Sequence, residues 1–309
     1  MLYYSNSERT LEDVVFDKFH TIEHDEFLVL SGYLGPSPIQ RLKQENRNST
    51  IIFGLANEGV QRKLHDRLIE LKEDVTILVP QIPSHAKIYA WKNQGKFKCI
   101  LNGSSNFSHR GLNNPFREIL EEVPCHSFHQ YEGYLKTILE SSIRYEDFML
   151  PLEAAETPPA YALECESPSL FAPGSKINWG HAPRGNVNMR DSYIHVSANQ
   201  IRNYPLMFPE KSPLRGLGFN DNDPIEIIWD DGTVMKGLLE GTQTIDGRRY
   251  PNKISSYPSK RILGDYLRRR MSLPLGCYVT PEMFSHYGRD TITISLHDDL
   301  YFFDFSSNT

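Results

Sequence analysis

A proline-rich, acidic segment between residues 151 and 175 divides the chain into two parts with different hydrophobic patterns. It holds five prolines and four glutamates but no lysine or arginine, a composition typical of a linker. Before it, short apolar runs alternate with helical periodicity, whereas after it short strand-like runs predominate. We therefore expect two domains joined by a linker, with bounds of 1–152, 153–175 and 176–309.

The first part has the pattern of an α/β layer. The runs EFLVLSGYL, STIIFGL and DVTILVP are short and apolar, as buried strands are. Between the last two runs, apolar residues recur at helical spacing behind Asn57 as the cap, and a second such series follows residue 118. The two series are Val60, Leu64, Leu68 and Leu71, and Tyr131, Leu135, Ile138 and Ile143. Both predict helices that cover a sheet.

The part from residue 176 onward consists of short strand-like runs separated by turns and by two long polar insertions. The runs are SYIHVS, PIEIIWDDGTVMKGLLEG, GCYVT and DTITISLHDDLYFFDF. Asp231-Gly232 predicts a hairpin turn, and a polar turn is expected at His297-Asp298-Asp299. Several short strands with such turns predict an all-β barrel or sandwich. Loops as long as the two insertions are usually functional.

Two short polar segments stand on either side of a predicted hairpin. His85 and Lys87 lie two residues apart, so on a strand they project to the same face, and Ser104 and Asn106 do likewise. The sequence Asn93-Gln94-Gly95 between them predicts a tight turn that sets the two strands side by side. An imidazole, an ammonium, a hydroxyl and a carboxamide gathered in this way suit a tetrahedral phosphate. The imidazole can attack phosphorus, and the others can hold the oxygens where charge builds.

Each half of this cluster also has a plainer interpretation. A histidine and a lysine can form a polar pair on an edge strand, and Gly103-Ser104-Ser105-Asn106 is also turn chemistry. The order of the elements between residues 85 and 118 favours the phosphate site. In that interpretation Gly103 lets the backbone approach the phosphate closely.

The stretch from His85 to Glu118 resembles the phospholipase D superfamily, whose motif is HxK followed by GSxN. The likeness extends through Ser108-His109-Arg110-Gly111-Leu112 and the spacing from Asn114 to Glu118. The phospholipase branch has an aspartate five residues after the lysine, where this chain has Lys92. The nuclease branch uses a later glutamate to orient the histidine. The resemblance therefore implies a nuclease in which Glu118 has that role.

The two-part layout resembles restriction endonucleases of the NgoFVII type and, more loosely, BfiI. These join a phospholipase D-like nuclease to a DNA-recognition domain of the plant B-three kind, which grips the major groove with two arms. The resemblance implies an N-terminal α/β phospholipase D-like domain and an all-β C-terminal pseudobarrel. It implies site-specific, metal-independent cleavage of double-stranded DNA with no cofactor. Because the chemistry needs two histidines and the chain has one such motif, it also implies a homodimer with a shared active site.

In that scheme His85 of one subunit attacks the scissile phosphorus to give a phosphohistidine, and the partner's His85 protonates the departing oxygen. Lys87, Ser104 and Asn106 stabilise the phosphorane, and Glu118 accepts the Nδ1 proton of His85. Relatives of this type work with a separately encoded helicase-like ATPase, and a cognate methyltransferase is a further expected partner. The chain has no GxxxxGK[ST] motif of its own, so any nucleotide dependence would come from that partner.

The net charge of −6 argues against a nucleic-acid partner until its distribution is considered. Residues 248–270 hold eight lysines and arginines against one aspartate, and such a local stripe is what binds phosphates. A solvated loop and helix end is the plainer interpretation of the same run. The residues expected to contact bases or phosphates are Arg202, Asn203, Arg248, Arg249, Lys253, Ser255, Ser256, Lys260, Arg268, Arg269 and Arg270.

Other features point away from further sites. The four cysteines form no CxxC pair, so neither a disulfide framework nor a thiolate zinc site is expected. Cys125, His126 and His129 lack a fourth ligand at zinc spacing, and no metal site is expected. Neither a signal peptide nor a membrane-spanning run is recognisable, so a soluble, cytoplasmic protein with no membrane partner is expected. A lipid phosphodiesterase and a non-catalytic DNA-binding protein with a degenerate nuclease domain stay open as alternatives.

Overall fold

The computed structural model describes residues 1–45, 48–72, 75–149, 163–170, 179, 188–211 and 222–307. The chain forms two compact units, Met1–Tyr161 and Ala162–Thr309, and each is described by itself. Among the residues that are described, no helix is both long and apolar enough to cross a membrane.

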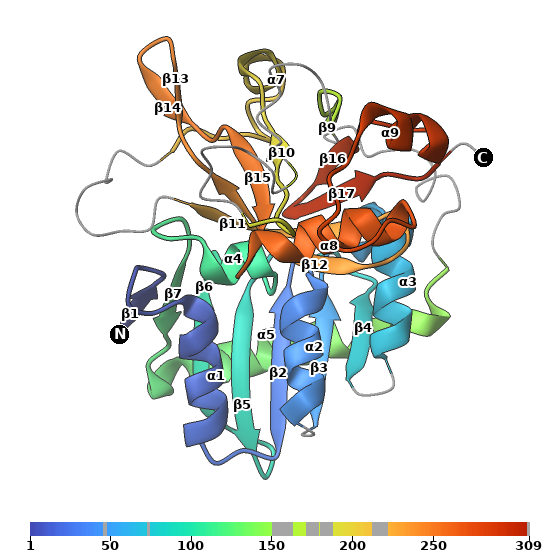
Figure 1. The fold of residues 1–309 in the computed structure, drawn as a ribbon. Helices are drawn as coiled ribbons and strands as arrows, with labels where there is room; N and C mark the ends of the chain where they lie inside the picture. The colour runs from blue at the N-terminus through green and yellow to red at the C-terminus, as the bar shows by residue number, and fades with distance from the viewer. Residues whose placement is uncertain are drawn as a thin grey trace. The chain divides into compact units, whose positions relative to one another are not determined.

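An eight-stranded mixed sheet forms the centre of the N-terminal unit (Figure 1). Its strands span Leu2–Tyr4 (β1), Glu26–Ser31 (β2), Ser49–Phe53 (β3), Thr76–Pro80 (β4), Ile88–Asn93 (β5), Lys96–Gly103 (β6), Ile119–Glu122 (β7) and Ser142–Arg144 (β8). They lie in the order β1-β7-β6-β5-β2-β3-β4-β8. The neighbours β2, β3 and β4 are parallel, and all other pairs are antiparallel. The predicted α/β layer is confirmed.

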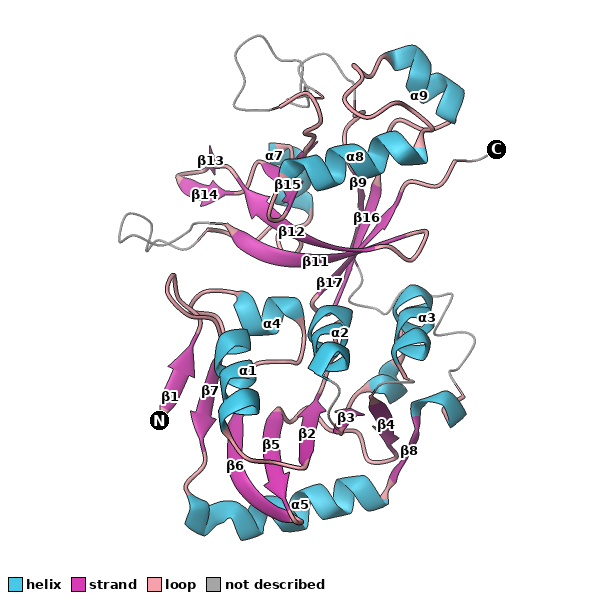
Figure 2. Ribbon diagram, turned by 60° about the horizontal axis from the view of Figure 1, so that its bottom comes forward, coloured by secondary structure: helices cyan, strands magenta, loops and turns pink. Residues whose placement is uncertain are grey.

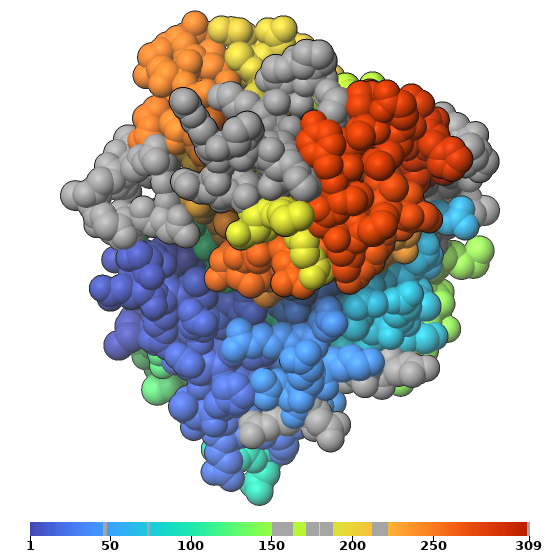
Figure 3. Space-filling view, viewed as in Figure 1, coloured from blue at the N-terminus to red at the C-terminus, as the bar shows by residue number. Residues whose placement is uncertain are grey.

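Helices cover both faces of this sheet. They span Leu11–Thr21 (α1), Pro36–Glu45 (α2), Arg62–Leu71 (α3), His109–Asn113 (α4) and Phe128–Glu140 (α5). α1, α2 and α3 lie on one face and α5 on the other (Figure 2), and the first three form the surface of this unit in Figure 3. The strands alternate accordingly. The Phe27 ring contacts Phe19 of α1 with their centroids 5.3 Å apart, whereas Leu28 lies in a buried cluster with Leu135 of α5.

The two predicted helices exist, with different ends. α3 buries Leu64, Leu68 and Leu71 as its spacing predicted, but its N-cap is Gln61, whose side chain accepts from the backbone of the first turn. Asn57 was wrong as the cap. Its amide instead donates to a carbonyl of β4. The second series also ends early, because the chain leaves α5 at Glu140 and Ile143 becomes part of β8.

A seven-stranded, curled sheet forms the C-terminal unit. Its strands span Leu163–Glu166 (β9), Ile194–His195 (β10), Asp223–Trp229 (β11), Val234–Glu240 (β12), Lys253–Ser256 (β15), Thr293–His297 (β16) and Leu300–Asp304 (β17). They lie in the order β10-β15-β12-β11-β17-β16-β9, and Gln243–Ile245 (β13) and Arg248–Tyr250 (β14) form a separate hairpin. The turns predicted at Asp231-Gly232 and at residues 297–299 join β11 to β12 and β16 to β17, as expected.

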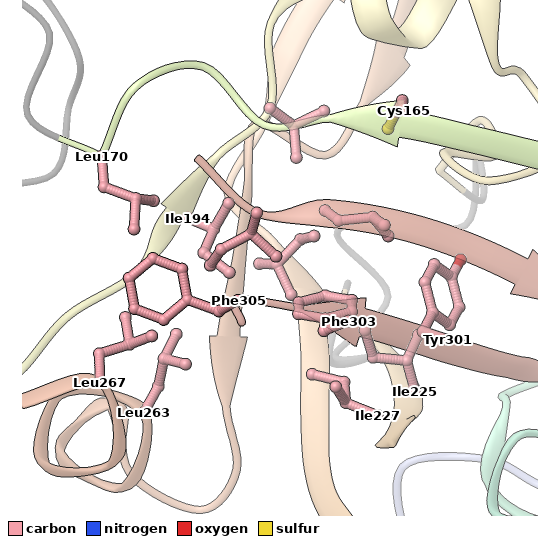
Figure 4. Close-up of a cluster of buried hydrophobic side chains, with 14 of the residues drawn as sticks. Cys165, Leu170, Ile194, Ile225, Ile227, Leu263, Leu267, Tyr301, Phe303 and Phe305 are labelled. Atoms are coloured by element: carbon pink, nitrogen blue, oxygen red, sulfur yellow. The ribbon is translucent and has the colours of Figure 1, made fainter. Parts of the chain in front are cut away.

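The C-terminal unit is not all-β, which corrects the expected fold class. Ala198–Asn203 (α7), Lys260–Arg270 (α8) and Pro281–Tyr287 (α9) are helices. Ser259 is the N-cap of α8, and its hydroxyl accepts from the backbone N–H of Arg261. The helix lies within the basic run of residues 248–270, for which a solvated loop and helix end was the plainer interpretation. Leu263 and Leu267, four residues apart, place one face of α8 against the core, with Ile227 of β11 and Phe303 of β17 (Figure 4).

The expected linker of 153–175 extends too far. Residues 163–166 form β9, one of the two edge strands of the sheet, and Cys165 pairs with Ile294 of β16. Beyond the strand, the Leu170 N–H donates to the Asp290 carbonyl (2.7 Å), and the Leu170 side chain is fully buried. Proline content alone misplaced this boundary, because the partner of β9 lies more than 120 residues away along the chain. Residues 153–162 and 171–175 of the predicted linker lie outside the described residues.

Candidate active site

The β5–β6 hairpin is the frame of the predicted phosphate site. Gln94 and Gly95 have φ angles of 52° and 73°, the two positive values of a tight turn that matches the twist of a hairpin. The predicted turn is therefore confirmed. At the other end of the hairpin, the Gly103 N–H donates to the Lys87 carbonyl (3.3 Å). The two polar segments thus lie side by side where the hairpin ends.

His85 and Lys87 meet at the loop that follows β2. His85 is exposed, whereas only 5% of the Lys87 surface is exposed, and the Lys87 ammonium donates to the His85 carbonyl (2.6 Å). A Cβ at Gly32 would stand 2.6 Å from Cδ2 of His85 and 3.3 Å from Nζ of Lys87. The imidazole and the ammonium therefore flank one point. A buried ammonium there attracts an anion more strongly than one in open water does.

Ser104 and Ser105 have different environments. Ser104 is exposed, and its hydroxyl oxygen accepts from the Ile119 N–H (3.1 Å). This bond leaves the Ser104 O–H as a donor toward the solvent side, where a phosphate oxygen can accept it. Ser105 is fully buried, and its hydroxyl donates to the Gly111 carbonyl (2.9 Å). Ser105 therefore fixes the loop, and Ser104 is the one of the two serines that is exposed.

The Asn106 carboxamide is held in one orientation. Its Oδ1 accepts from the Tyr33 N–H (3.3 Å) and lies 3.5 Å from the Ser31 hydroxyl. With the oxygen turned to these groups, the amide NH₂, which only donates, faces away from them. Behind the motif, a Cβ at Gly111 would stand 2.5 Å from the Asn106 carbonyl oxygen. The glycine in the Ser108–Leu112 tail thus lets α4 pack against the loop.

Glu118 lies just before β7, and its surface is partly exposed. Burial raises the pKa of Tyr89, and the charge of Glu118 raises it further, which places that carboxylate near the Tyr89 phenol. The Tyr89 hydroxyl donates to the Ser105 carbonyl (2.9 Å). Glu118 therefore belongs to the same neighbourhood as the loop of residues 104–106. Its role toward the His85 imidazole stays a prediction.

Two residues of the motif region have roles that the sequence did not indicate. A Cβ at Gly103 would stand 2.1 Å from the Ile119 carbonyl oxygen. Glycine is thus required there by the close approach of β7, and this corrects the prediction that it admits a phosphate. Lys92, at the family's aspartate position, lies near the far end of β5 and pairs with Glu26 (3.5 Å). The Lys92 charge therefore lies at the ends of β5 and β2 that are farthest from His85 and Lys87.

Gly32 and Tyr33 are the functional neighbours that the sequence reasoning missed. Gly32 lies against His85 and Lys87, and the Tyr33 ring meets the His85 ring edge-on with 5.7 Å between their centroids. Both follow the buried strand β2 in the run EFLVLSGYL. Glycine and polar residues directly after a buried strand of an α/β sheet often line a site, and that signal was present in the sequence.

Among the described residues, no group of three or more histidine, cysteine or acidic side chains is placed to hold a metal ion. Of the three residues considered for such a site, Cys125, His126 and His129, the last forms a hydrogen bond between its ring Nδ1 and the His126 carbonyl (2.9 Å). Cys125 is exposed as a free thiol.

In the C-terminal unit, the structure brings together the two long polar insertions that were expected to be the DNA-binding arms, HVSANQIRNYPLMFPEKS and TQTIDGRRYPNKISSYPSKRILGDYLRRR. Arg202 and Asn203 end α7 and are exposed. Arg202 lies 3.7 Å from Asp246, in the turn of the β13–β14 hairpin. The Lys211 N–H donates to the Arg249 carbonyl on β14 (2.8 Å). These contacts join α7 and its following segment to the hairpin, so the two arms form one continuous surface.

Three further cations of this surface pair with carboxylates. Arg248 is exposed and lies 3.6 Å from Glu210. Lys253 and Lys260 flank Glu240 at 3.2 and 3.0 Å. Burial alone would raise the pKa of Glu240, but the ion pairs with Lys260 and Lys253 outweigh it and lower the pKa. The Glu240 carboxylate is therefore held ionised between the two lysines.

Two serines expected to contact DNA are buried instead. Ser255 and Ser256 expose 1% and 2% of their surfaces. The Ser256 hydroxyl donates to the Ser259 carbonyl (2.7 Å) and accepts from the Leu263 N–H (2.8 Å). It therefore ties β15 to the start of α8. Neither serine is accessible to a base or a phosphate, and both predictions were wrong.

Three consecutive arginines of α8 have three different environments. Arg268 is fully buried, and its guanidinium donates to five backbone carbonyls, those of Trp179, Met189, Arg190, Gly264 and Cys277. Arg270 forms a two-bond pair with Asp230 (3.0 and 2.6 Å). Arg269 is exposed. The prediction that all three contact DNA was wrong for Arg268, whose donors are all taken by the backbone, and Arg270 is committed to an internal carboxylate.

Comparisons with known proteins agree with this geometry in both units. Residues 9–148 match the family model for the NgoFVII restriction endonuclease N-terminal PLD domain, where PLD stands for phospholipase D. Residues 154–298 match the model for the NgoFVII C-terminal B3-like DNA-binding domain. No curated protein matches the chain.

Among solved structures, a polyphosphate kinase from Porphyromonas gingivalis is 15% identical, with a TM-score of 0.31, over 43% of this chain and 21% of that one. The match thus spans about a fifth of the kinase, and a likeness this low carries no argument. The two family models cover both units in the expected order and contain the His85 and GSxN segments. The chain belongs to the NgoFVII family of restriction endonucleases.

Proposed function

We propose that this chain is a site-specific DNA endonuclease that cuts phosphodiesters through a phosphohistidine, in an active site shared by two subunits. The observation that carries the proposal is the convergence of His85 and Lys87 at Gly32, beside the oriented carboxamide of Asn106. This cluster lies in a segment similar to a restriction endonuclease domain, followed by one similar to a DNA-binding domain.

The first chemical step is an attack by the exposed His85 imidazole on the scissile phosphorus. A P–N bond forms and the P–O bond to the leaving nucleoside breaks, and the partner's His85 gives its proton to the departing oxygen. Glu118 accepts the Nδ1 proton of His85 and so turns Nε2 toward phosphorus. In the second step, water deprotonated by the partner's His85 attacks phosphorus and releases the histidine.

The charge that develops on the phosphorane is met by three donors. The Lys87 ammonium lies in a buried position, where its attraction for an anion is least screened. The Ser104 O–H and the Asn106 NH₂ add two neutral donors from the loop after β6. We propose that these groups and His85 suffice without a metal ion, since they supply both the nucleophile and the countercharge.

DNA recognition is assigned to the C-terminal surface. Apart from Arg270, which is partly exposed but pairs with Asp230, the accessible or partly accessible members of the predicted set are Arg202, Asn203, Arg248, Arg249, Lys253, Lys260 and Arg269. The contacts between α7 and the β13–β14 hairpin support their acting as one surface on double-stranded DNA. A separate helicase-like ATPase and a cognate methyltransferase are further proposed partners, and any nucleotide dependence would come from the ATPase.

The test is cleavage of phage DNA in excess EDTA, with and without ATP, followed by sequencing of the fragment ends. We expect fragments with one common end sequence. His85→Ala should abolish them and leave DNA binding unchanged, whereas His129→Ala, a second exposed histidine on α5, should cleave normally. The proposal would be contradicted by fragments with random end sequences, or by a cleavage activity of His85→Ala within tenfold of the wild-type activity.

The shared site has its own test. Wild-type and His85→Ala chains are co-expressed with different tags at several ratios, and activity is compared with the wild-type fraction. A site that needs a histidine from each of two subunits gives activity that follows the square of that fraction. A linear dependence would show that one chain is sufficient and would remove the dimeric mechanism.

A further inference from the structure

Residues 31–33, here called the β2 loop, contact both halves of the proposed catalytic cluster. On one side, the Gly32 backbone lies so close to His85 and Lys87 that a Cβ would stand 2.6 Å from the imidazole carbon Cδ2 and 3.3 Å from the ammonium. The Tyr33 ring adds an edge-on contact with the His85 ring, with centroids 5.7 Å apart and planes at 72°. The exposed imidazole is thereby bounded on two sides by this loop.

On its other side, the β2 loop holds the segment that carries Asn106. The Tyr33 N–H donates to Asn106 Oδ1 (3.3 Å). The fully buried Ser31 hydroxyl accepts from the Phe107 N–H (2.9 Å) and donates to the Tyr33 carbonyl (2.6 Å). One residue, Tyr33, therefore touches the nucleophile through its ring and the carboxamide through its backbone.

Resting on the proposed function, we propose that the β2 loop is a positioning element that sets the His85 ring and the Asn106 amide relative to the same phosphate. His85 and Asn106 belong to two segments that precede β5 and follow β6, and the hairpin alone fixes only their backbones. Attack at phosphorus needs the imidazole nitrogen in line with the leaving oxygen, and an error of about 1 Å can cost roughly 100-fold in rate. Gly32 and Tyr33 are thus positioning residues that act through His85 and Asn106.

Gly32→Ala is the sharpest perturbation, because the nearest atoms that its methyl meets belong to side chains. The His85 ring is exposed and can turn away, so the fold survives while the imidazole moves. Gly133→Ala is the matched control, since a Cβ at Gly133 meets nothing within 4 Å. We expect Gly32→Ala to lower kcat by about 100-fold with KM and DNA affinity unchanged, and Gly133→Ala to match wild type. Equal activity of the two variants would overturn the proposal.

Two substitutions of Tyr33 test the role of its ring and the role of its hydroxyl separately. Tyr33→Phe keeps the edge-on contact with His85 and the backbone donor to Asn106, so it should retain activity within about threefold, whereas Tyr33→Ala removes the ring and should lose at least tenfold in kcat. A loss in Tyr33→Phe as large as that in Tyr33→Ala would show that the hydroxyl, rather than the ring, has the role. That result would overturn the assignment for Tyr33.

A readout without DNA separates this proposal from the proposed function. Long-range ¹H–¹⁵N NMR of the full chain reports each histidine ring, and the His85 signals are assigned by their loss in His85→Ala. We expect Gly32→Ala to shift the His85 signals and leave those of His129 in place. Unchanged His85 signals would overturn the positioning role, whereas shifted signals in a protein that cleaves no DNA would leave it standing and remove the nuclease assignment.

Discussion

Replacing Arg268 by methionine tests whether the first arginine of the basic triplet stabilises the fold or binds DNA. The guanidinium is fully buried and its five N–H groups serve five backbone carbonyls. Its centre also lies 5.4 Å from the Trp179 ring centroid. Methionine has a similar length and no donor, so it fills much of the space and leaves the carbonyls without partners.

The expected cost follows from those contacts. A hydrogen bond from a charged donor contributes about 1.5–3 kcal/mol, part of which is offset because the guanidinium itself is taken out of water. Removing one side of a buried charged network costs about 3–5 kcal/mol in total. For a unit of this size that corresponds to a fall in Tm of roughly 6–20 °C. Arg269→Met is the matched control, since Arg269 is exposed and its loss should change stability by less than about 0.5 kcal/mol.

The assay is urea unfolding of the full chain followed by tryptophan fluorescence, because Trp179 stacks near the guanidinium and reports its loss. DNA affinity is then measured against salt for both variants under conditions where both are folded. A phosphate contact contributes about one unit to the log–log salt slope. The structural role of Arg268 is refuted if the free energy of unfolding of Arg268→Met lies within about 1 kcal/mol of the wild-type value and the salt slope of its DNA affinity is about one unit flatter. The prediction that Arg268 contacts DNA would then be restored.

Three further outcomes are expected. His85→Ala should reduce cleavage to background in EDTA, and wild type should stay active there; strict dependence on Mg²⁺ without ATP would contradict metal independence. The folded-state pKa of Glu240 lies below its usual value, so its stabilising effect is present above about pH 4.3 and is lost as pH falls through the lowered value. The stability advantage of wild type over Glu240→Gln should therefore be full at pH 7 and shrink below about pH 4 in acid titration by circular dichroism. A fragment of residues 162–309 should unfold at a higher urea concentration than one of 176–309, which lacks β9 and Leu170; equal midpoints would show that β9 adds no stability.

The sequence alone determined the features that depend on nearby residues. The turn at Gln94-Gly95, the buried face of α3 and the hairpin at Asp231-Gly232 follow from periodicity and turn chemistry over a few positions, and each is found where it was expected. The polar segments around His85 and Asn106 could be brought together by the same local reasoning, because a tight hairpin leaves little freedom in how its two strands pair.

Only the tertiary structure decided which charged and small residues are committed to the fold. Arg268 and Arg269 are identical neighbours, yet one is buried because Trp179, Met189 and Cys277 supply carbonyls around it, and the other is exposed. A composition count cannot separate them, since burial of a charge depends on partners that are distant in the chain.

The same reason explains Gly32, β9 and Gly103. Gly32 lies against residues more than 50 positions away, β9 pairs with β16 from the far end of the chain, and Gly103 is glycine because the neighbouring strand β7 lies close against it. Contacts between distant segments leave no periodic trace in the sequence, whereas hairpins and helices do. The catalytic motif could therefore be recognised from the sequence. The β2 loop, which we propose positions His85 and Asn106, could be recognised only from the tertiary structure.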